Sequence, residues 1–156
     1  FLNRCAQLLT LLPFVPMMDG GERYVQPVFV EDIADAIMSS LNRSDALGQV
    51  FELGGPEVLD MKTIYEMVAN LTKKKNNAVE TPRFVAMTLA RMMEITPWEP
   101  LLTRDELRRI SEDIIVHEGV NGFEKLGISP QSLHNKARLI LGAFRGGGRS
   151  FAETTP

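Results

Sequence analysis

Few residues in this chain combine a reactive side chain with a recognisable spacing. One proton-transfer arrangement places a lysine four residues after a tyrosine, because the ammonium group lowers the pKa of the phenol. Tyr24 is followed at that spacing by Val28, and Tyr65 is followed by Ala69. Neither tyrosine therefore fits this chemistry.

The cysteine and histidine content also argues against a nucleophilic or metal site. Cys5 is the only cysteine, and the two histidines, His117 and His134, lie far from it in the last third of the sequence. His117 is next to Glu118 in a stretch that we expect to be an exposed loop, and His134 lies beside the apolar positions of a helix. We predict no catalytic residue and no metal ligand in this chain.

A phosphate-binding glycine loop is also missing. Dinucleotide-binding domains place a G-x-G-x-x-G turn between a strand and a helix, so that backbone amides can reach the pyrophosphate. None of the twelve glycines forms this pattern. Gly54 and Gly55 stand between an expected strand and an expected helix, but Pro56 follows, and a tight turn is favoured over a phosphate site.

Composition is that of a soluble globular domain of 156 residues, with 44% hydrophobic and 24% charged residues. The net charge of −3 indicates no basic face for nucleic acid. The apolar runs are far below the ~20 residues that a transmembrane helix needs. One cysteine excludes an internal disulfide, and Phe1 at the first position leads us to expect further residues upstream.

Two strand-to-helix units dominate the first half of the sequence. Residues 24–30 predict a strand, and Asp32 could cap or complement the following helix, whose inner face would be Ile33, Ala36 and Ile37. Residues 50–53 predict a second strand before a helix that Asp60 could cap. The inner positions of that second helix would be Ile64, Met67, Val68 and Leu71.

The remainder predicts mostly helices. A leading helix ends at residue 12, and residues 83–95 are apolar on nearly all sides, as in a helix held between two surfaces. Thr103 and Glu106 form a capping box, residues 114–116 are a possible strand, and the last helix would start at Ser129 and Pro130. Its inner stripe would be Leu133, Ala137, Ile140, Leu141 and Phe144. Residues 73–75, three lysines, fit the solvated last turn of a helix better than a phosphate or lipid contact.

These patterns predict an α/β fold in three parts. Residues 1–75 would be the trailing strand-helix units of a dinucleotide-binding domain, residues 76–145 a mostly helical C-terminal subdomain, and residues 146–156 a flexible tail. A fold of this kind without its first half would leave an unpaired sheet edge. It would also leave faces such as Ile64, Met67 and Leu71 partly uncovered, so we expect a companion segment.

The order of motifs resembles the C-terminal half of the atypical short-chain dehydrogenase/reductase family, in its branch that serves mitochondrial respiratory complex I. The resemblance runs from Phe1 to about Leu141. It rests on QPVFVEDIADAI, FELGGPEVL, TPWEPLLTRDEL and GFEKLGISP. The first of these occurs in many extended dehydrogenases and epimerases, whereas its combination with Pro97-Trp98-Glu99-Pro100 is more specific.

The resemblance implies a non-catalytic accessory subunit of complex I, on the matrix side of the mitochondrial inner membrane. It would belong to the peripheral arm near the membrane junction and contact other complex I subunits. A structural NADPH would be bound mainly by the missing N-terminal half, on the same or a separate chain, and Gln26 at the entrance of the first strand could line its pocket. The surfaces offered to neighbours would be residues 83–95, Trp98 and the last helix.

Two other interpretations remain open. The chain could be a fragment of an NAD(P)-dependent extended short-chain reductase or epimerase, in which case the upstream part would hold a complete glycine loop and a Tyr-x-x-x-Lys pair. It could also be a small binding module that folds alone.

Overall fold

The computed structural model describes residues 1–95, 100, 102–110 and 112–144. Trp98 and the predicted tail at 146–156 lie outside these residues. The chain forms two compact units that alternate along the sequence. Unit 1 is Phe1–Tyr24, Asp60–Asp113 and Ala137–Pro156, and unit 2 is Val25–Leu59 and Ile114–Lys136. The predicted division at residue 75 concerns domains of a longer fold and stays a prediction.

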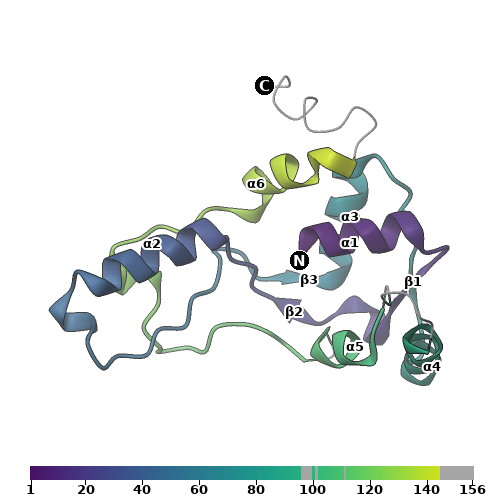
Figure 1. Cartoon of the computed structure of the whole chain (residues 1–156), viewed down its shortest axis with the longest axis horizontal. Coiled ribbons are helices and arrows are strands. Elements are labelled where there is room, and N and C mark those ends of the chain that lie inside the picture. The colour runs from purple at the N-terminus through teal and green to yellow at the C-terminus, as the bar shows by residue number, and fades with distance from the viewer. Residues whose placement is uncertain (96–99, 101, 111, 145–156) are drawn as a thin grey trace. The chain divides into compact units, whose positions relative to one another are not determined.

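A helical layer forms the largest part of unit 1. It consists of α1 (Leu2–Leu11), α3 (Met61–Thr72) and the 3-10 turn η4 (Leu141–Phe144), which contact one another (Figure 1). The predicted helix up to residue 12 and the predicted α3 are confirmed. The Asp60 carboxylate caps α3 by accepting a hydrogen bond from the Thr63 backbone N–H at 3.0 Å, as expected.

The inner face of α3 is better covered than the sequence suggested. Ile64 and Val68 are fully buried, while Met67 and Leu71 are half-buried. Cover comes from α1, which turns Cys5, Ala6 and several leucines inward. The expected gap at Ile64 was therefore wrong. The helix also ends earlier than predicted, because Lys73 takes a left-handed conformation with φ 56°, and residues 73–75 follow the last turn.

Unit 1 also contains a two-stranded parallel sheet. β1 (Val15–Met17) pairs with β4 (Ala78–Glu80), with Val15 opposite Ala78 and Met17 opposite Glu80. Parallel neighbours need a long crossover, and the connection from Met17 to Ala78 includes α3 as its last helix. Neither strand was predicted, because each has only three residues and β1 contains Pro16. After β1, Asp19 and Gly20 adopt positive φ in the 3-10 turn η1 (Met18–Gly21).

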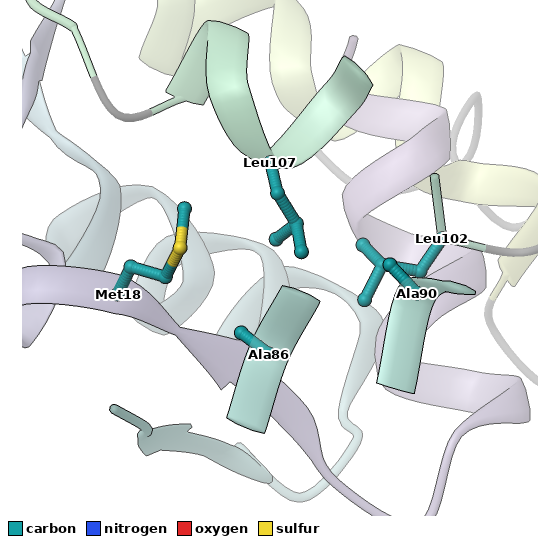
Figure 2. Packing of buried hydrophobic residues seen from close by; sticks show 5 residues of the cluster. All are labelled: Met18, Ala86, Ala90, Leu102 and Leu107. Carbon is teal, nitrogen blue, oxygen red and sulfur yellow. The ribbon is translucent and has the colours of Figure 1, made fainter. Parts of the chain in front are cut away.

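Two helices enclose a second core in unit 1. Figure 2 shows Leu107 of α5 (Arg104–Ile110) pointing toward Ala86 of α4 (Arg83–Glu94), with Leu102 beside Ala90. The capping box is confirmed, since Thr103 Oγ1 accepts from Glu106 N and the Glu106 carboxylate accepts from Thr103 N, both at 3.1 Å. The small side chains of Ala86 and Ala90 allow the close approach.

The outer face of α4 is apolar and exposed. Only Ala86 and Ala90 are buried along this helix, whereas Phe84, Val85, Met92 and Ile95 are exposed. Within the described residues the helix is therefore covered on one face, and cover of its other face by a second surface stays a prediction.

Unit 2 is built from α2 (Val30–Leu41), the 3-10 turns η2 (Ser44–Ala46) and η3 (Phe123–Leu126), and long connecting segments. Its core is formed by Ala36 of α2 against Phe123 and Leu126 of η3, flanked by Val28, Ile33, Phe51, Leu53 and Ile128. Phe123 and Leu126 are the two ends of the 3-10 turn η3 and are both buried.

The strands predicted at residues 24–30, 50–53 and 114–116 are longer than those that the structure forms. Residues 24–30 contain only β2 (Tyr24–Val25), and residues 50–53 and 114–116 form single parallel bridges, Phe51 with Asn121 and Val25 with Ile114. A further two-residue strand, β3 (Leu59–Asp60), precedes α3. Pro27 lacks the N–H that a ladder requires, and single bridges are too short to extend into a sheet.

Two helix features of the structure also differ from their predictions. The Asp32 carboxylate does not cap α2, because it accepts hydrogen bonds from Gln131 N at 2.8 Å and Gln131 Nε2 at 3.2 Å. The last helix, α6 (Leu133–Ile140), starts three residues after Pro130. Leu133, Ala137 and Leu141 are buried as expected, whereas Ile140 is exposed.

The fold is α/β, as predicted, with helices joined by short parallel pairings. No helix among the described residues has the length and apolar character to cross a membrane.

Candidate functional site

An open hollow in unit 2 contains the residue predicted to line a cofactor pocket. Its volume is about 480 Å³, and Gln26 lies on its wall. Opposite Gln26 are residues from two other segments. The lining residues are Glu52, Gly54, Gly55, Pro56, Val116, Val120, Gly122, Phe123, Glu124 and Pro130.

The side chain of Gln26 connects two of these segments. Its Nε2 donates a hydrogen bond to Gly55 O at 2.8 Å, and its Oε1 accepts one from Val116 N at 2.9 Å. The backbone N–H of Gln26 donates to Ile114 O at 2.9 Å. Both polar ends of the side-chain amide are therefore engaged by the protein backbone, and Gln26 holds the wall of the hollow in place.

Gly54 and Gly55 are required by close packing at this point. A Cβ on Gly55 would lie 1.8 Å from Pro27 O, and a Cβ on Gly54 would lie 2.5 Å from the Gln26 side chain. Neither glycine has a positive φ. The pair serves as a close contact between backbone segments. In place of the predicted tight turn, the structure has only a bend at Pro56.

A second link across the hollow joins Glu52 to His117. The Glu52 carboxylate accepts hydrogen bonds from His117 N at 2.9 Å and lies 2.9 Å from His117 Nδ1. The backbone bond, followed by the ring contact, holds the pKa of Glu52 below its ordinary value. The sequence placed His117 with its neighbour Glu118, and no local signal could have indicated a partner 65 residues away.

The hollow does not fit the phosphates of a dinucleotide. Its charged lining residues are Glu52 and Glu124, and it contains neither lysine nor arginine among its described walls. Carboxylates repel a pyrophosphate, and helix N-termini or basic side chains normally bind one. The amide of Gln26 is also already engaged. These residues can hold a loop in shape, but they do not form a pyrophosphate site.

Two reactive side chains of unit 1, those of Cys5 and Tyr65, are buried. Burial raises the pKa of the Cys5 thiol to about 12 and raises the pKa of the Tyr65 hydroxyl as well. Tyr65 lines a cavity of about 20 Å³, which has room for about one water molecule and none for a substrate. The described residues contain no group of three or more side chains that could hold a metal ion.

Comparison with known proteins identifies relatives over almost the whole chain. The chain is 30% identical to NADH dehydrogenase (ubiquinone) 1 alpha subcomplex subunit 9 of Rattus norvegicus over 146 residues, which are 93% of this chain and 38% of that protein. It is 25% identical to the subunit of the same name from Arabidopsis thaliana, covering 98% of this chain and 40% of that protein. The chain is therefore similar to this complex I subunit over nearly all of its own length. The resemblance predicted from the motifs is thereby confirmed.

A fungal relative and a solved structure extend the comparison. The NADH-ubiquinone oxidoreductase 40 kDa subunit of Neurospora crassa is 26% identical over 93% of this chain and 39% of its own length. The crystal structure of gox2253 superimposes with a TM-score of 0.55 at 23% identity, covering 95% of this chain and 43% of that one. That likeness shows a shared fold. No model of a known protein family matches the sequence.

The chain spans about two fifths of the length of the relatives it matches. Those relatives are named as mitochondrial proteins. The shared part is the one that contains the alternating units 1 and 2.

Proposed function

We propose that this chain is the C-terminal part of a non-catalytic accessory subunit of respiratory complex I. The observation that carries the proposal is the similarity to alpha subcomplex subunit 9 over 93% of the chain. The α/β fold and its superposition on a longer solved chain support a Rossmann-type fold, of which these residues would supply the trailing units and the helical subdomain.

The proposed place is the matrix side of the mitochondrial inner membrane, in the peripheral arm near its junction with the membrane arm. The relatives are mitochondrial subunits of the same oxidoreductase. The outer face of α4, with Phe84, Met92 and Ile95 exposed, offers an apolar surface for a neighbouring subunit. Apolar surfaces of this kind are typical of subunit contacts.

A structural NADPH belongs to this proposal, bound mainly by an N-terminal half. The acidic lining of the hollow supports placing the phosphate contacts outside these residues. In this arrangement Gln26 positions the Gly55 segment at the pocket wall, and its side-chain amide does not bind the nucleotide directly. When bound, such a nucleotide would stabilise the fold and transfer no electrons.

We propose that the chain is not catalytic because of the burial, the pKa values and the sequence neighbours of its candidate side chains. Cys5 and Tyr65 are buried and their pKa values are raised, so that neither is a thiolate or phenolate near neutral pH. Tyr24 is exposed but has Val28 where a lysine would be needed.

Complementation of a cell line that lacks the subunit tests this function. The full-length wild-type protein should comigrate with complex I in native gels and restore its NADH:ubiquinone activity. Variants Tyr24→Phe and Tyr65→Phe should restore it equally, because no proton transfer depends on either hydroxyl. Failure of the wild type to enter complex I would contradict the proposal. Turnover of NADPH by the free protein, lost in either tyrosine variant, would instead support a reductase or epimerase.

A further inference from the structure

The turn between α1 and β1 places apolar side chains in water. Leu11 is 59% exposed, Phe14 is 39% exposed, and Pro13 between them is exposed as well. The buried side of α1, with residues such as Cys5 and Leu8, faces α3 instead. We call Leu11, Pro13 and Phe14 the apolar turn. Within the described residues of unit 1, these three side chains stay open to water.

Three lysines lie beside the apolar turn. Residues 73–75, the lysine cluster, follow α3, and all three side chains are exposed. The residues after them join the apolar turn, because the Asn77 side-chain amide donates a hydrogen bond to Leu12 O at 2.7 Å and Val15 N donates one to Asn77 O at 2.9 Å. Both groups belong to unit 1 and form one corner of it, which we call the basic corner.

Hydrogen bonds hold the backbone of the lysine cluster at both ends. Lys73 has φ 56°, a left-handed helix end where glycine is the usual residue, and Lys74 N donates to Ala69 O at 3.0 Å. On the other side, Asn76 Oδ1 accepts from Ala78 N at 3.1 Å. The three ammonium groups therefore extend from a fixed turn next to the apolar side chains.

No carboxylate balances these three positive charges. Residues 1–18 and 67–79 contain neither aspartate nor glutamate, although the chain has 20 acidic residues and a net charge of −3. In the part of the chain that the structure describes, the lysine cluster forms no ion pair. A concentrated positive charge on a protein of negative net charge directs this corner toward an anionic surface.

The combination of lysines with exposed apolar residues indicates which kind of anionic surface fits. Lysine is depleted in protein–protein interfaces. Segments that lie at the surface of a bilayer combine both residue types, since leucine and phenylalanine enter the boundary of the acyl chains while lysines contact anionic headgroups. A soluble phosphate would use the ammonium groups and leave Leu11 and Phe14 in water.

We propose that the basic corner binds the surface of an anionic lipid bilayer. The lysines supply the charge, at about a fivefold gain in binding per lysine near such a surface, and the apolar turn enters the interface. The apolar turn thus gives a role to lysines that the sequence alone assigned to a solvated helix end. Binding is a property of the corner itself. Only the identification of the bilayer as the mitochondrial inner membrane rests on the proposed function.

Vesicle flotation of the full-length protein tests this inference. The protein should float with vesicles that contain phosphatidylglycerol and stay behind with vesicles of phosphatidylcholine alone. Salt at ~1 M should release it, because the Debye length then falls to about 3 Å. A combined variant with glutamine in place of the lysine cluster, Lys73→Gln, Lys74→Gln and Lys75→Gln, should bind at least ~10-fold more weakly.

A second combined variant controls for the change in net charge. It removes three cations from other exposed positions of unit 1, by Lys62→Gln, Arg83→Gln and Arg91→Gln. This control should bind within ~3-fold of wild type, and both variants should keep the Tm of wild type within about one degree, because all six side chains are exposed. An equal loss of binding in both variants would overturn the proposal, since general charge would then explain it.

The apolar turn is tested separately by Leu11→Ser, with Ile95→Ser on the outer face of α4 as its control. Leu11→Ser should weaken vesicle binding by at least ~3-fold, whereas Ile95→Ser should leave it unchanged. Unchanged binding of Leu11→Ser would overturn the bilayer assignment. Release of the wild type from the vesicles by soluble glycerol 3-phosphate would also overturn it, and would assign the lysine cluster to a free phosphate.

These results separate the inference from the proposed function. A wild-type protein that ignores anionic vesicles but comigrates with complex I would overturn the inference and leave the proposed function intact. Binding to anionic vesicles through residues 73–75, by a protein that never enters complex I, would support the basic corner and contradict the proposed function.

Discussion

Gln26 Nε2 donates a hydrogen bond to Gly55 O at 2.8 Å, across 29 residues of sequence. Through its other end the same amide accepts from Val116 N, so one half-buried side chain ties together three segments of unit 2. The residue predicted to line a cofactor pocket is thus a structural link in the wall of the hollow.

Removing this amide should destabilise unit 2. Gln26→Ala leaves Gly55 O and Val116 N without their partner, and we expect a loss of about 1 to 3 kcal/mol in the free energy of unfolding. Gln26→Glu keeps an acceptor for Val116 N but cannot donate to Gly55 O while it is ionised. At neutral pH its loss of unfolding free energy should therefore lie between that of wild type and that of Gln26→Ala, or exceed that of Gln26→Ala. Urea denaturation of the full-length protein measures both. Equal stability of Gln26→Ala and wild type would show that the two bonds do not form.

Gly55 should tolerate no side chain. Gly55→Ala would bring its Cβ to 1.8 Å from Pro27 O, and the backbone would have to move, so we expect a loss of several kcal/mol or failure to fold. Gly122→Ala is the matched control in the same hollow, because a Cβ there would lie 3.8 Å from its nearest neighbour, Glu52 O, and the φ of Gly122 is negative. That control should change stability by less than about 1 kcal/mol. Similar Tm values for the two variants would contradict the close approach at Gly55.

The contact between Glu52 and His117 should make stability sensitive to acid. The pKa of Glu52 is held below its ordinary value in the folded state, by the hydrogen bond from His117 N and then by its ring. A depressed carboxyl pKa stabilises the fold above the unfolded-state pKa, and this contribution is lost as the pH falls through the folded-state pKa. The advantage of wild type over Glu52→Gln should therefore be full near neutral pH and shrink below roughly pH 4.

Glu118→Gln is the control for this experiment, because it makes the same change in charge next to His117. Its difference from wild type should lack that acid dependence if Glu52 is the partner. Unfolding midpoints measured from neutral pH to the acid limit of reversible folding decide the matter, and an NMR titration of the Glu52 carboxyl checks the direction directly.

Cys5 should resist alkylation in the folded protein. Its thiol is buried in α1 with a pKa raised to about 12, so the reactive thiolate is scarce at neutral pH and reagents lack access. Iodoacetamide should modify Cys5 rapidly in urea and at least ~100-fold more slowly in buffer. Fast modification of the native protein would show that α1 does not pack its Cys5 face against α3.

Local signals predicted the helices of unit 1 well. Asp60 before α3 and the Thr103–Glu106 box before α5 act within three residues of sequence, and both form the predicted hydrogen bonds. The parallel pair of β1 and β4 was missed, because three residues give no periodicity and their partner lies more than 60 residues away. Tertiary contact alone makes those residues strands.

Features that depend on distant partners were predicted less well. Asp32 has the type and position of a helix cap, but Gln131 captures its carboxylate from 99 residues away. Ile37 has the spacing of an inner residue, yet the hydrogen bonds of Asp32 and Ser39 fix the opposite face of α2 inward. Periodicity shows that a helix has an apolar face and does not show which surface covers it.

The sequence alone determined the α/β class, the caps of α3 and α5, the missing glycine loop, and the motifs whose resemblance the relatives confirm. These properties depend on residues that are close together in the sequence, because local backbone geometry and residue spacing control them. Only the tertiary structure decided that Gln26 links Gly55 to Val116, that Glu52 meets His117, and that α2 turns Ile37 outward. Each of these joins segments far apart in the chain, and the energy that selects among such pairings comes from the packing of the whole unit.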